Sequence, residues 1–272
     1  MAKGRTNNYI MAGIAIVGSY VGMELLARKY SEQEDFNYDN SYLKTDTDIR
    51  DDSYSLYESV IKKKLDKIVS FIGLIVLSPL FCFISLIIII DDPGPIFFTQ
   101  KRVGKNKEFF QLHKFRSMRM NAPHNVPTHQ LTEPNRYITR VGRVLRKTSM
   151  DELPQIWDVF RGKMSMIGPR PALWNQEDLV AERDLYRVNG LIPGLTGWAQ
   201  INGRDELEIP AKAKLDGEYA KKMRTGGMVA LLFDIWCLFN TILSIFKANG
   251  VVEGGTGQIK NVKKENSTDG SK

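Results

Sequence analysis

The chain has 272 residues, of which 43% are hydrophobic and 25% are charged. This ordinary globular mixture excludes wholesale disorder, and too little of the chain lies in apolar runs for a polytopic membrane protein. Its 38 lysines and arginines against 31 acidic residues give a net charge of +7. That balance suits an anionic partner, whether nucleic acid, anionic lipid or phosphorylated substrate, without choosing among them.

Cysteine and histidine are too scarce for a disulfide scaffold or a zinc cluster. The two cysteines, Cys82 and Cys237, lie in apolar stretches, and the three histidines are His113, His124 and His129. We therefore expect a reduced cytosolic setting, and any metal should use carboxylates, which favours Mg²⁺ with Mn²⁺ as the alternative. We interpret His113 as a strand residue at a basic surface rather than a catalyst. We do not favour His124 and His129 as a pair of metal ligands.

The first 60 residues fall into two parts. An apolar stretch from Tyr9 to Ala27 follows Lys3 and Arg5. It predicts a membrane anchor within residues 1–30 rather than a signal peptide, because no small-residue cleavage site follows it. Residues 31–60 are polar and acidic with little periodicity, which predicts a linker.

Residues 61–92 are predicted to form a membrane helix. Ile68 to Ile90 is a run of 23 residues without a charge, and at roughly 1.5 Å per residue it could cross a bilayer core of about 30 Å. Ser78-Pro79 at its middle predicts a kink, because proline lacks an N–H and its ring pushes against the preceding turn. Basic residues flank both ends, and the positive-inside rule places both in the cytosol. These features favour a re-entrant helix, with a straight span as the open alternative.

Two short strands are predicted beyond the turn at Asp91–Pro95. Ile96–Gln100 and Phe109–Phe115 have strand patterns, with Gly104–Asn106 as the hairpin turn between them. A helical pattern resumes from Tyr137.

A second apolar run extends from Met228 to Phe246. On a helix its polar residues Asp234, Thr241 and Ser244 share one side. Such a helix either lies in the membrane interface or packs within the protein, and Trp236 favours the interface.

The segment most informative about chemistry spans residues 143–155. Basic residues lead into Ser149 and then into the adjacent acids Asp151 and Glu152. A purely structural interpretation is a helix start in which Ser149 and Glu152 form a capping box. A functional interpretation, compatible with the first, keeps Asp151 ionised as a nucleophile, with Arg146 neutralising phosphoryl charge. Because adjacent helical residues point in different directions, Glu152 should have a separate role on Mg²⁺ or a proton.

Two loops could contribute to the same site. In Gly168–Pro171 a proline on each side of Arg170 restricts the backbone and holds the cation. Pro193–Arg204 is rich in glycine around Trp198, but it matches neither the P-loop nor the dinucleotide fingerprint.

Taken together, these residues resemble the bacterial sugar transferases that are monotopic phosphoglycosyl transferases. The resemblance runs from about Lys62 to about Phe246. It rests on six ordered motifs: Ser78-Pro79, Gly94–Gln100, Lys114–Met118, Leu145–Gln155, Gly168–Pro171 and Pro193–Arg204. It implies an α+β fold: a mostly helical cytosolic domain with a small β-hairpin, a re-entrant membrane helix broken at Ser78-Pro79, and interfacial amphipathic helices.

The resemblance also implies an activity of the EC 2.7.8 type. A sugar 1-phosphate would pass from a UDP-sugar to polyprenyl (undecaprenyl) phosphate, with release of UMP and with Mg²⁺, as the first membrane step of exopolysaccharide, capsule or other glycoconjugate synthesis. Asp151 would form a phosphosugar-aspartyl intermediate, and Asp151 and Glu152 would hold the metal. The implied phosphate-binding cations are Arg146, Arg170, Lys114 and Arg116. The family serves several sugars, so the sugar stays open.

The expected organisation is an anchor at 1–30, a linker at 31–60, a re-entrant helix at 61–92, a catalytic domain at 93–247 with an interfacial C-terminal helix, and a disordered tail at 248–272. The resemblance implies the bacterial inner membrane, with the catalytic domain on its cytosolic face. Inner-leaflet anionic lipid is an expected partner, a second copy or downstream glycosyltransferases are further ones, and nucleic acid is not.

Two rivals stay open at this stage. One is a membrane-tethered basic protein that binds anionic lipid or nucleic acid without catalysis, and the other is the same transfer in a single direct step. The favoured interpretation expects Asp151 to be charged, reachable from the cytosol and close to lipid headgroups.

Overall fold

The structure is a computed structural model that describes residues 55–122, 134–203 and 207–247. The predicted anchor, residues 31–54 of the predicted linker, His124 and His129, and the tail at 248–272 lie outside the described residues.

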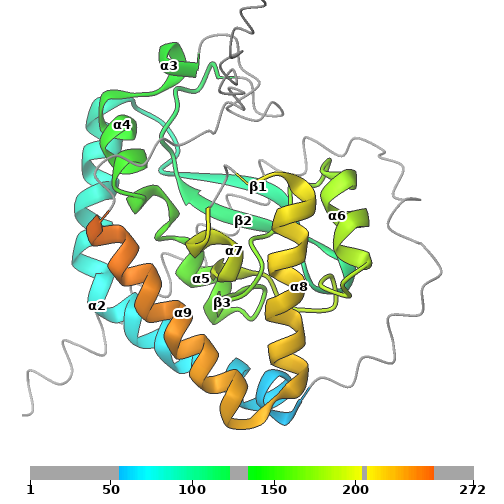
Figure 1. Cartoon of the computed structure of the whole chain (residues 1–272). Coiled ribbons are helices and arrows are strands. Elements are labelled where there is room, and N and C mark those ends of the chain that lie inside the picture. Colours follow the sequence, from blue (N-terminus) through cyan, green and yellow to red (C-terminus); the bar gives the residue numbers. More distant parts are fainter. Residues whose placement is uncertain (1–54, 123–133, 204–206, 248–272) are drawn as a thin grey trace, which may run out of the picture.

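The described chain is mostly helical with little sheet (Figure 1). Its α-helices are α2 (Lys62–Asp91), α3 (Pro134–Tyr137), α4 (Arg140–Lys147), α5 (Gln155–Phe160), α6 (Glu177–Asp184), α7 (Trp198–Ile201), α8 (Ile209–Thr225) and α9 (Gly227–Lys247). One π-helical turn is η4 (Tyr57–Ile61), and two short 3₁₀ helices are η5 (Lys105–Lys107) and η7 (Met150–Glu152). The strands are β1 (Phe97–Val103), β2 (Phe109–Phe115), β3 (Ser165–Ile167) and β4 (Gly194–Thr196).

Helix α2 is continuous through Pro79 rather than broken there. The π-helical turn η4 leads directly into it, so helix begins at Tyr57, before the predicted start at residue 61. Pro79 cannot donate to the carbonyl of Ile75, and the Ser78 hydroxyl donates to that oxygen instead, at 2.8 Å. Figure 1 shows α2 changing direction along its length. The expected break is therefore a bend with its carbonyl satisfied, and the helix ends at Asp91 as predicted.

One side of α2 builds the main hydrophobic core. Its inward residues pack against β2, α4 and α5. The buried members are Leu74, Phe81, Ile84, Ile88, Phe115, Leu145, Ile156 and Trp157. The hairpin β1–β2 is antiparallel and pairs Phe97 with Phe115. Both predicted strands are present, and β1 extends to Val103, past the predicted Gln100.

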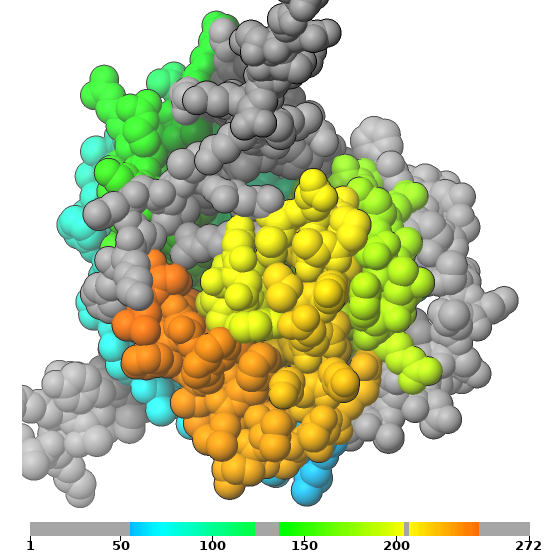
Figure 2. All heavy atoms as spheres, viewed as in Figure 1, coloured from blue at the N-terminus to red at the C-terminus, as the bar shows by residue number. Residues whose placement is uncertain are grey.

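The other side of α2 and the outer side of α9 are apolar and exposed. The stretches Tyr57–Asp91 and Gly227–Ser244 are long and apolar enough to cross a membrane, and only 22% and 17% of their apolar windows are buried. A helix whose apolar residues mostly miss the core needs another apolar environment. In Figure 2, α9 lies at the molecular surface next to α8.

The polar side of α9 faces the protein, as its pattern allowed. Asp234 is buried and accepts hydrogen bonds from Tyr57 (2.8 Å), Lys62 (2.5 Å) and Tyr219 (2.8 Å). Thr241 meets Thr196 at 2.9 Å. These contacts attach α9 to the start of α2, to α8 and to β4, and they leave the apolar residues of its outer side exposed.

Candidate active site

The predicted acidic pair lies on the short turn η7 between α4 and α5. Ser149 has a left-handed backbone with φ of 54° and makes no side-chain capping hydrogen bond. The predicted capping box is therefore wrong, because the Glu152 side chain is directed to cations instead.

Two of the predicted cations meet at Glu152. Arg170 contacts both carboxylate oxygens, at 2.6 Å to Oε1 and 3.2 Å to Oε2, and Lys114 donates to Oε1 at 2.7 Å. Burial alone would raise the pKa of Glu152, but Arg170 and Lys114 outweigh it and hold that pKa well below its ordinary value. Glu152 is therefore a carboxylate at neutral pH.

Asp151 is buried beside this cluster. Only 2% of the residue is exposed, so the expectation of a carboxylate reachable from solvent is not met in this structure. Glu152 keeps 15% of its side chain exposed and Arg170 keeps 25%. Solvent can therefore reach Glu152 and the cations that hold it, but it hardly reaches Asp151.

The other two predicted cations have different partners. The Nε atom of Arg146 donates to the Ser117 hydroxyl at 2.8 Å. Arg116 is buried, donates to the backbone carbonyl of Asp92 and lies 3.4 Å from its carboxylate. Arg116 therefore joins the end of α2 to the segment after β2, and it does not contact Glu152.

The segments that carry these residues are held together by close backbone approaches. A Cβ on Gly142 would lie 2.0 Å from the carbonyl oxygen of Ser117, so only glycine lets α4 pack there. Thr139 caps α4 by accepting from the Gly142 amide at 2.8 Å. Asp91, the last residue of α2, accepts from the Val141 amide at 2.9 Å. The end of α2 and the start of α4 are thus fixed to each other.

The two predicted loops lie together. Strands β3 and β4 pair in parallel, and the Gly168 amide donates to the Thr196 carbonyl at 2.8 Å. A Cβ on Gly194 would lie 2.1 Å from the Gly168 nitrogen, and one on Gly197 would lie 2.1 Å from the Gly168 oxygen. The glycine pattern of both loops thus reflects this close backbone contact, and it positions Arg170 next to the glycine-rich loop.

Sequence reasoning missed the residues that hold the backbone of Arg170 in place. Arg183 on α6 donates to the Arg170 carbonyl at 3.0 Å. Asp216 on α8 holds Arg183 through Nε at 2.9 Å and Nη2 at 2.5 Å. No local sequence signal links these residues, since they come from separate helices.

His113 is a strand residue, as interpreted, but it is buried rather than at a basic surface. Its Nδ1 lies 2.7 Å from Asp158, whose carboxylate also accepts from the His113 amide at 2.9 Å. Burial raises the pKa of Asp158, and the contacts with His113 oppose that rise. The pair joins β2 to α5 beneath the site.

The acidic pair can take part in a metal site only together with other ligands. Among the described residues no three His, Cys, Asp or Glu side chains gather in one place. Mg²⁺ is commonly held by one or two carboxylates together with substrate phosphate and water, and Asp151 and Glu152 suffice for that mode. Glu152 would have to release Arg170 or Lys114 to share an oxygen with the metal. The released cation would then be placed near the phosphate.

Two adjacent carboxylates and two cations, on a domain with exposed apolar helices, point to an enzyme class that handles phosphorylated substrates beside a membrane. Residues 57–248 match the family described as bacterial sugar transferase. The chain belongs to that family, as the sequence motifs predicted.

Relatives that match the chain are named for sugar-phosphate transfer or exopolysaccharide production. An exopolysaccharide production protein PSS of Rhizobium leguminosarum bv. phaseoli is 36% identical over 68% of this chain and 94% of its own length. A UDP-glucose:undecaprenyl-phosphate glucose-1-phosphate transferase of Escherichia coli K12 is 36% identical over 69% of this chain, but the match covers 40% of that protein. A UDP-N-acetylgalactosamine-undecaprenyl-phosphate N-acetylgalactosaminephosphotransferase of Aeromonas hydrophila is 35% identical over 70% and 44%.

Proposed function

We propose that the protein transfers a sugar 1-phosphate from a UDP-sugar to undecaprenyl phosphate and releases UMP, as the first membrane step of exopolysaccharide or related glycoconjugate synthesis. The observation that carries this proposal is the pairing of Glu152 with Arg170 and Lys114 immediately next to Asp151. Acidic and cationic groups in one place suit a phosphoryl transfer in which a carboxylate attacks and cations stabilise the moving charge.

The transfer proceeds in two steps. A carboxylate oxygen of Asp151 attacks the phosphorus attached to the sugar, and the bond from that phosphorus to the UMP oxygen breaks. The phosphosugar is then linked to Asp151, and an oxygen of the lipid phosphate attacks the same phosphorus and restores the carboxylate. The covalent intermediate lets a soluble donor and a membrane acceptor use one site in turn. Asp151 and Glu152 would hold Mg²⁺ together with substrate phosphate, and the ion would supply charge stabilisation at the phosphoryl oxygens.

The cations have separate tasks in this proposal. Arg170 and Lys114, already at Glu152, turn toward the phosphates when the donor enters. Arg146 binds a phosphate from the end of α4. Arg116 acts from further away, because it fixes the end of α2 through Asp92. Since Asp151 is buried, the side chains and backbone that cover its carboxylate must move when the donor binds.

The exposed apolar residues of α2 and α9 support the membrane arrangement that we propose. Helix α2 enters the inner leaflet of the bacterial inner membrane, bends at Ser78-Pro79 and returns, so that the domain stays on the cytosolic side. Both its flanks are basic, which a straight span would separate. Helix α9 lies in the interface through its outer residues, among them Trp236, which is 45% exposed.

A radiolabel assay tests the proposal. Membranes containing the protein are incubated with labelled UDP-glucose, UDP-galactose, UDP-N-acetylglucosamine and UDP-N-acetylgalactosamine, each with undecaprenyl phosphate. Labelled lipid and free UMP are expected with one donor of the panel. Asp151→Asn should lower turnover by about a thousandfold or more, whereas Asp178→Asn, an exposed acid on α6, should leave it unchanged.

Two outcomes would contradict the proposal. A fully active Asp151→Asn enzyme would remove the nucleophile, and lipid binding without turnover by any donor would favour the non-catalytic rival. Incubation with donor alone distinguishes the two-step route from a direct transfer, because only the former leaves a phosphosugar on the peptide that contains Asp151.

A further inference from the structure

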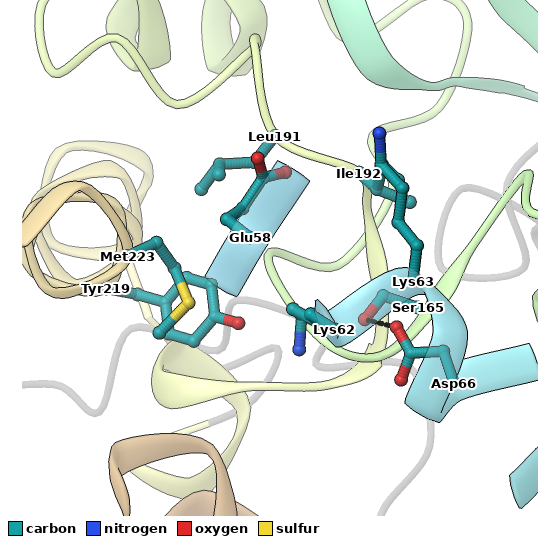
Figure 3. A pocket seen from close by; sticks show the side chains of 9 residues that line it. All are labelled: Glu58, Lys62, Lys63, Asp66, Ser165, Leu191, Ile192, Tyr219 and Met223. Carbon is teal, nitrogen blue, oxygen red and sulfur yellow. Dashed lines mark hydrogen bonds between the residues drawn. The ribbon is translucent and has the colours of Figure 1, made fainter. Parts of the chain in front are cut away.

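A cavity lies away from the acidic pair, and its charged lining residues are mostly cations. Its volume is about 470 Å³. Five of its lining residues are cationic and two are acidic: Lys63, Lys67, Lys105, Arg161 and Lys163 against Asp66 and Glu108. One of the acids is already engaged, because Asp66 accepts from the Ser165 hydroxyl at 2.6 Å. Figure 3 shows this contact.

This cavity is not part of the site at Glu152. It meets β2 at Phe109 and Phe110, whereas Lys114, which holds Glu152, is at the other end of that strand. At roughly 3.3 Å per residue, Phe110 and Lys114 are about 13 Å apart. The cavity also meets the carboxyl end of α5, at Phe160 and beyond, while the acidic pair precedes the amino end of that helix.

The cations gather there because two separate segments meet the start of α2. Lys62 and Lys63 are neighbours but extend in opposite directions in Figure 3. Lys62 turns inward to Asp234, and Lys63 lines the cavity. Burial lowers the pKa of Lys105, and the nearby Lys63 lowers it further against the opposing effect of Glu58. An anion in the cavity would relieve this repulsion between cations.

The cavity is continuous with the exposed apolar side of α2. Phe160 lines the cavity, the Lys67 amine lies 5.8 Å from its ring centroid, and the Phe71 ring lies 5.9 Å from it. Phe71 itself is 47% exposed, and its neighbours Ile68 and Ile72 are exposed as well. One ligand could therefore place an anionic group among the cations and a hydrocarbon chain along the helix.

We propose that this cavity binds the phosphate headgroup of an anionic phospholipid, with its acyl chains along Ile68, Phe71 and Ile72. The proposal rests on the membrane placement of α2 inferred above and adds a specific lipid site to it. A soluble phosphate or nucleotide would satisfy the cations but would leave the adjoining apolar surface uncovered. A zwitterionic lipid would bring its own positive charge against five cations. Bound lipid would fix the start of α2 relative to the hairpin turn and the loop after α5.

A charge-matched pair of variants tests the site. Lys67→Gln, Arg161→Gln and Lys163→Gln together remove three exposed cations from the cavity. The control removes three exposed lysines from α8, through Lys214→Gln, Lys221→Gln and Lys222→Gln. Both variants lose the same net charge, so a general attraction to anionic membranes falls equally in the two.

The full-length protein is purified in mild detergent and titrated with short-chain phosphatidylglycerol below its micelle concentration, with bound lipid counted by native mass spectrometry. The wild type and the α8 variant should bind one lipid with equal affinity, and the cavity variant should bind it about tenfold more weakly or worse. Phosphatidylcholine, inorganic phosphate and UMP are titrated in parallel, and none should displace the lipid at equal concentration.

Equal binding by the two variants would overturn the site. Displacement by UMP or inorganic phosphate would overturn its assignment to lipid. If the triple variant does not fold, Lys163→Glu against Lys222→Glu gives the same comparison. Lipid counting needs no turnover, so failure of this proposal is distinguishable from failure of the proposed transferase activity.

Discussion

Arg170 makes a bidentate contact with Glu152, in which Nη2 lies 2.6 Å from Oε1 and Nη1 lies 3.2 Å from Oε2. A guanidinium that bonds both carboxylate oxygens fixes the plane of the carboxylate as well as its position. The backbone of Arg170 is itself held by Arg183 and, through it, by Asp216. The position of the Glu152 carboxylate next to Asp151 therefore depends on a chain of hydrogen bonds from Arg170 through Arg183 to Asp216 on α8.

Replacing Arg170 by lysine should damage activity although the charge is kept. A lysine offers one compact charge and cannot make the two-point contact. We expect turnover of the preferred UDP-sugar to fall by about 10- to 100-fold. The exposed Arg143, changed to lysine, is the control and should have no effect. Equal activity of the two variants would show that the two-point contact has no role.

The depressed pKa of Glu152 predicts how its contribution to stability changes with pH. Its folded pKa is lower than its unfolded pKa, so the contribution is fully present above the unfolded pKa of about 4.3 and is lost as pH falls through the folded pKa. The thermal unfolding midpoint of the wild type should exceed that of Glu152→Gln at pH 6 to 8. The gap should narrow below about pH 4.3, and a gap that widens on acidification would contradict the assignment.

The buried pair of Lys62 and Asp234 should respond differently to single and double substitution. Lys62→Met leaves an uncompensated carboxylate among two tyrosines and should lower stability by about 3 kcal/mol. Lys62→Met combined with Asp234→Leu removes both charges and should recover most of that loss. Thermal unfolding in detergent measures both. A double variant less stable than the single one would contradict this expectation, because Asp234 would then stabilise the fold through Tyr57 and Tyr219 even without Lys62.

Gly194 is predicted to be intolerant of any side chain. Its Cβ would meet backbone atoms of Gly168, so Gly194→Ala must push β3 and β4 apart, at a cost of about 2–3 kcal/mol. The control is Gly73→Ala in α2, where, apart from the helix's own backbone, a Cβ would come nearest to the flexible Ile156 side chain, 3.5 Å away. Gly73→Ala should keep both stability and activity, and Gly194→Ala should lose both.

Metal dependence should appear only together with the donor. Glu152 is already held by Lys114 and Arg170 and Asp151 is buried, so the two carboxylates should bind Mg²⁺ weakly without the donor. Chelation with EDTA should therefore stop turnover but leave the unfolding midpoint unchanged. With Mn²⁺ as a probe, UDP-sugar should diminish the free-ion electron paramagnetic resonance signal for the wild type. Asp151→Asn should show no such loss. Tight Mn²⁺ binding without donor would contradict this shared site.

Patterns along the chain predicted the elements whose signal is local. These elements are the helix whose charge-free run precedes Asp91, the two hairpin strands and the polar side of α9. Each follows from the spacing of hydrophobic residues along the chain and from the turn residues that bound the segment. The capping box at Ser149 was a local pattern too, and it failed because Arg170 and Lys114 offer Glu152 stronger partners than a backbone amide does. The proline pattern predicted a kink at Ser78-Pro79, and α2 bends but stays continuous, with the Ser78 hydroxyl donating to the carbonyl that proline leaves without a donor.

The sequence by itself determined the family, the acidic pair and the set of cations around it, because each motif is short and contiguous. Only the tertiary structure decided which cation meets which acid: Lys114 and Arg170 reach Glu152, Arg116 goes to Asp92, and Asp151 becomes buried. The same holds for the attachment of α9 through Asp234 to Lys62, 172 residues earlier. Such pairings depend on how the chain closes long loops around its core, and residue type and spacing carry no information about that closure.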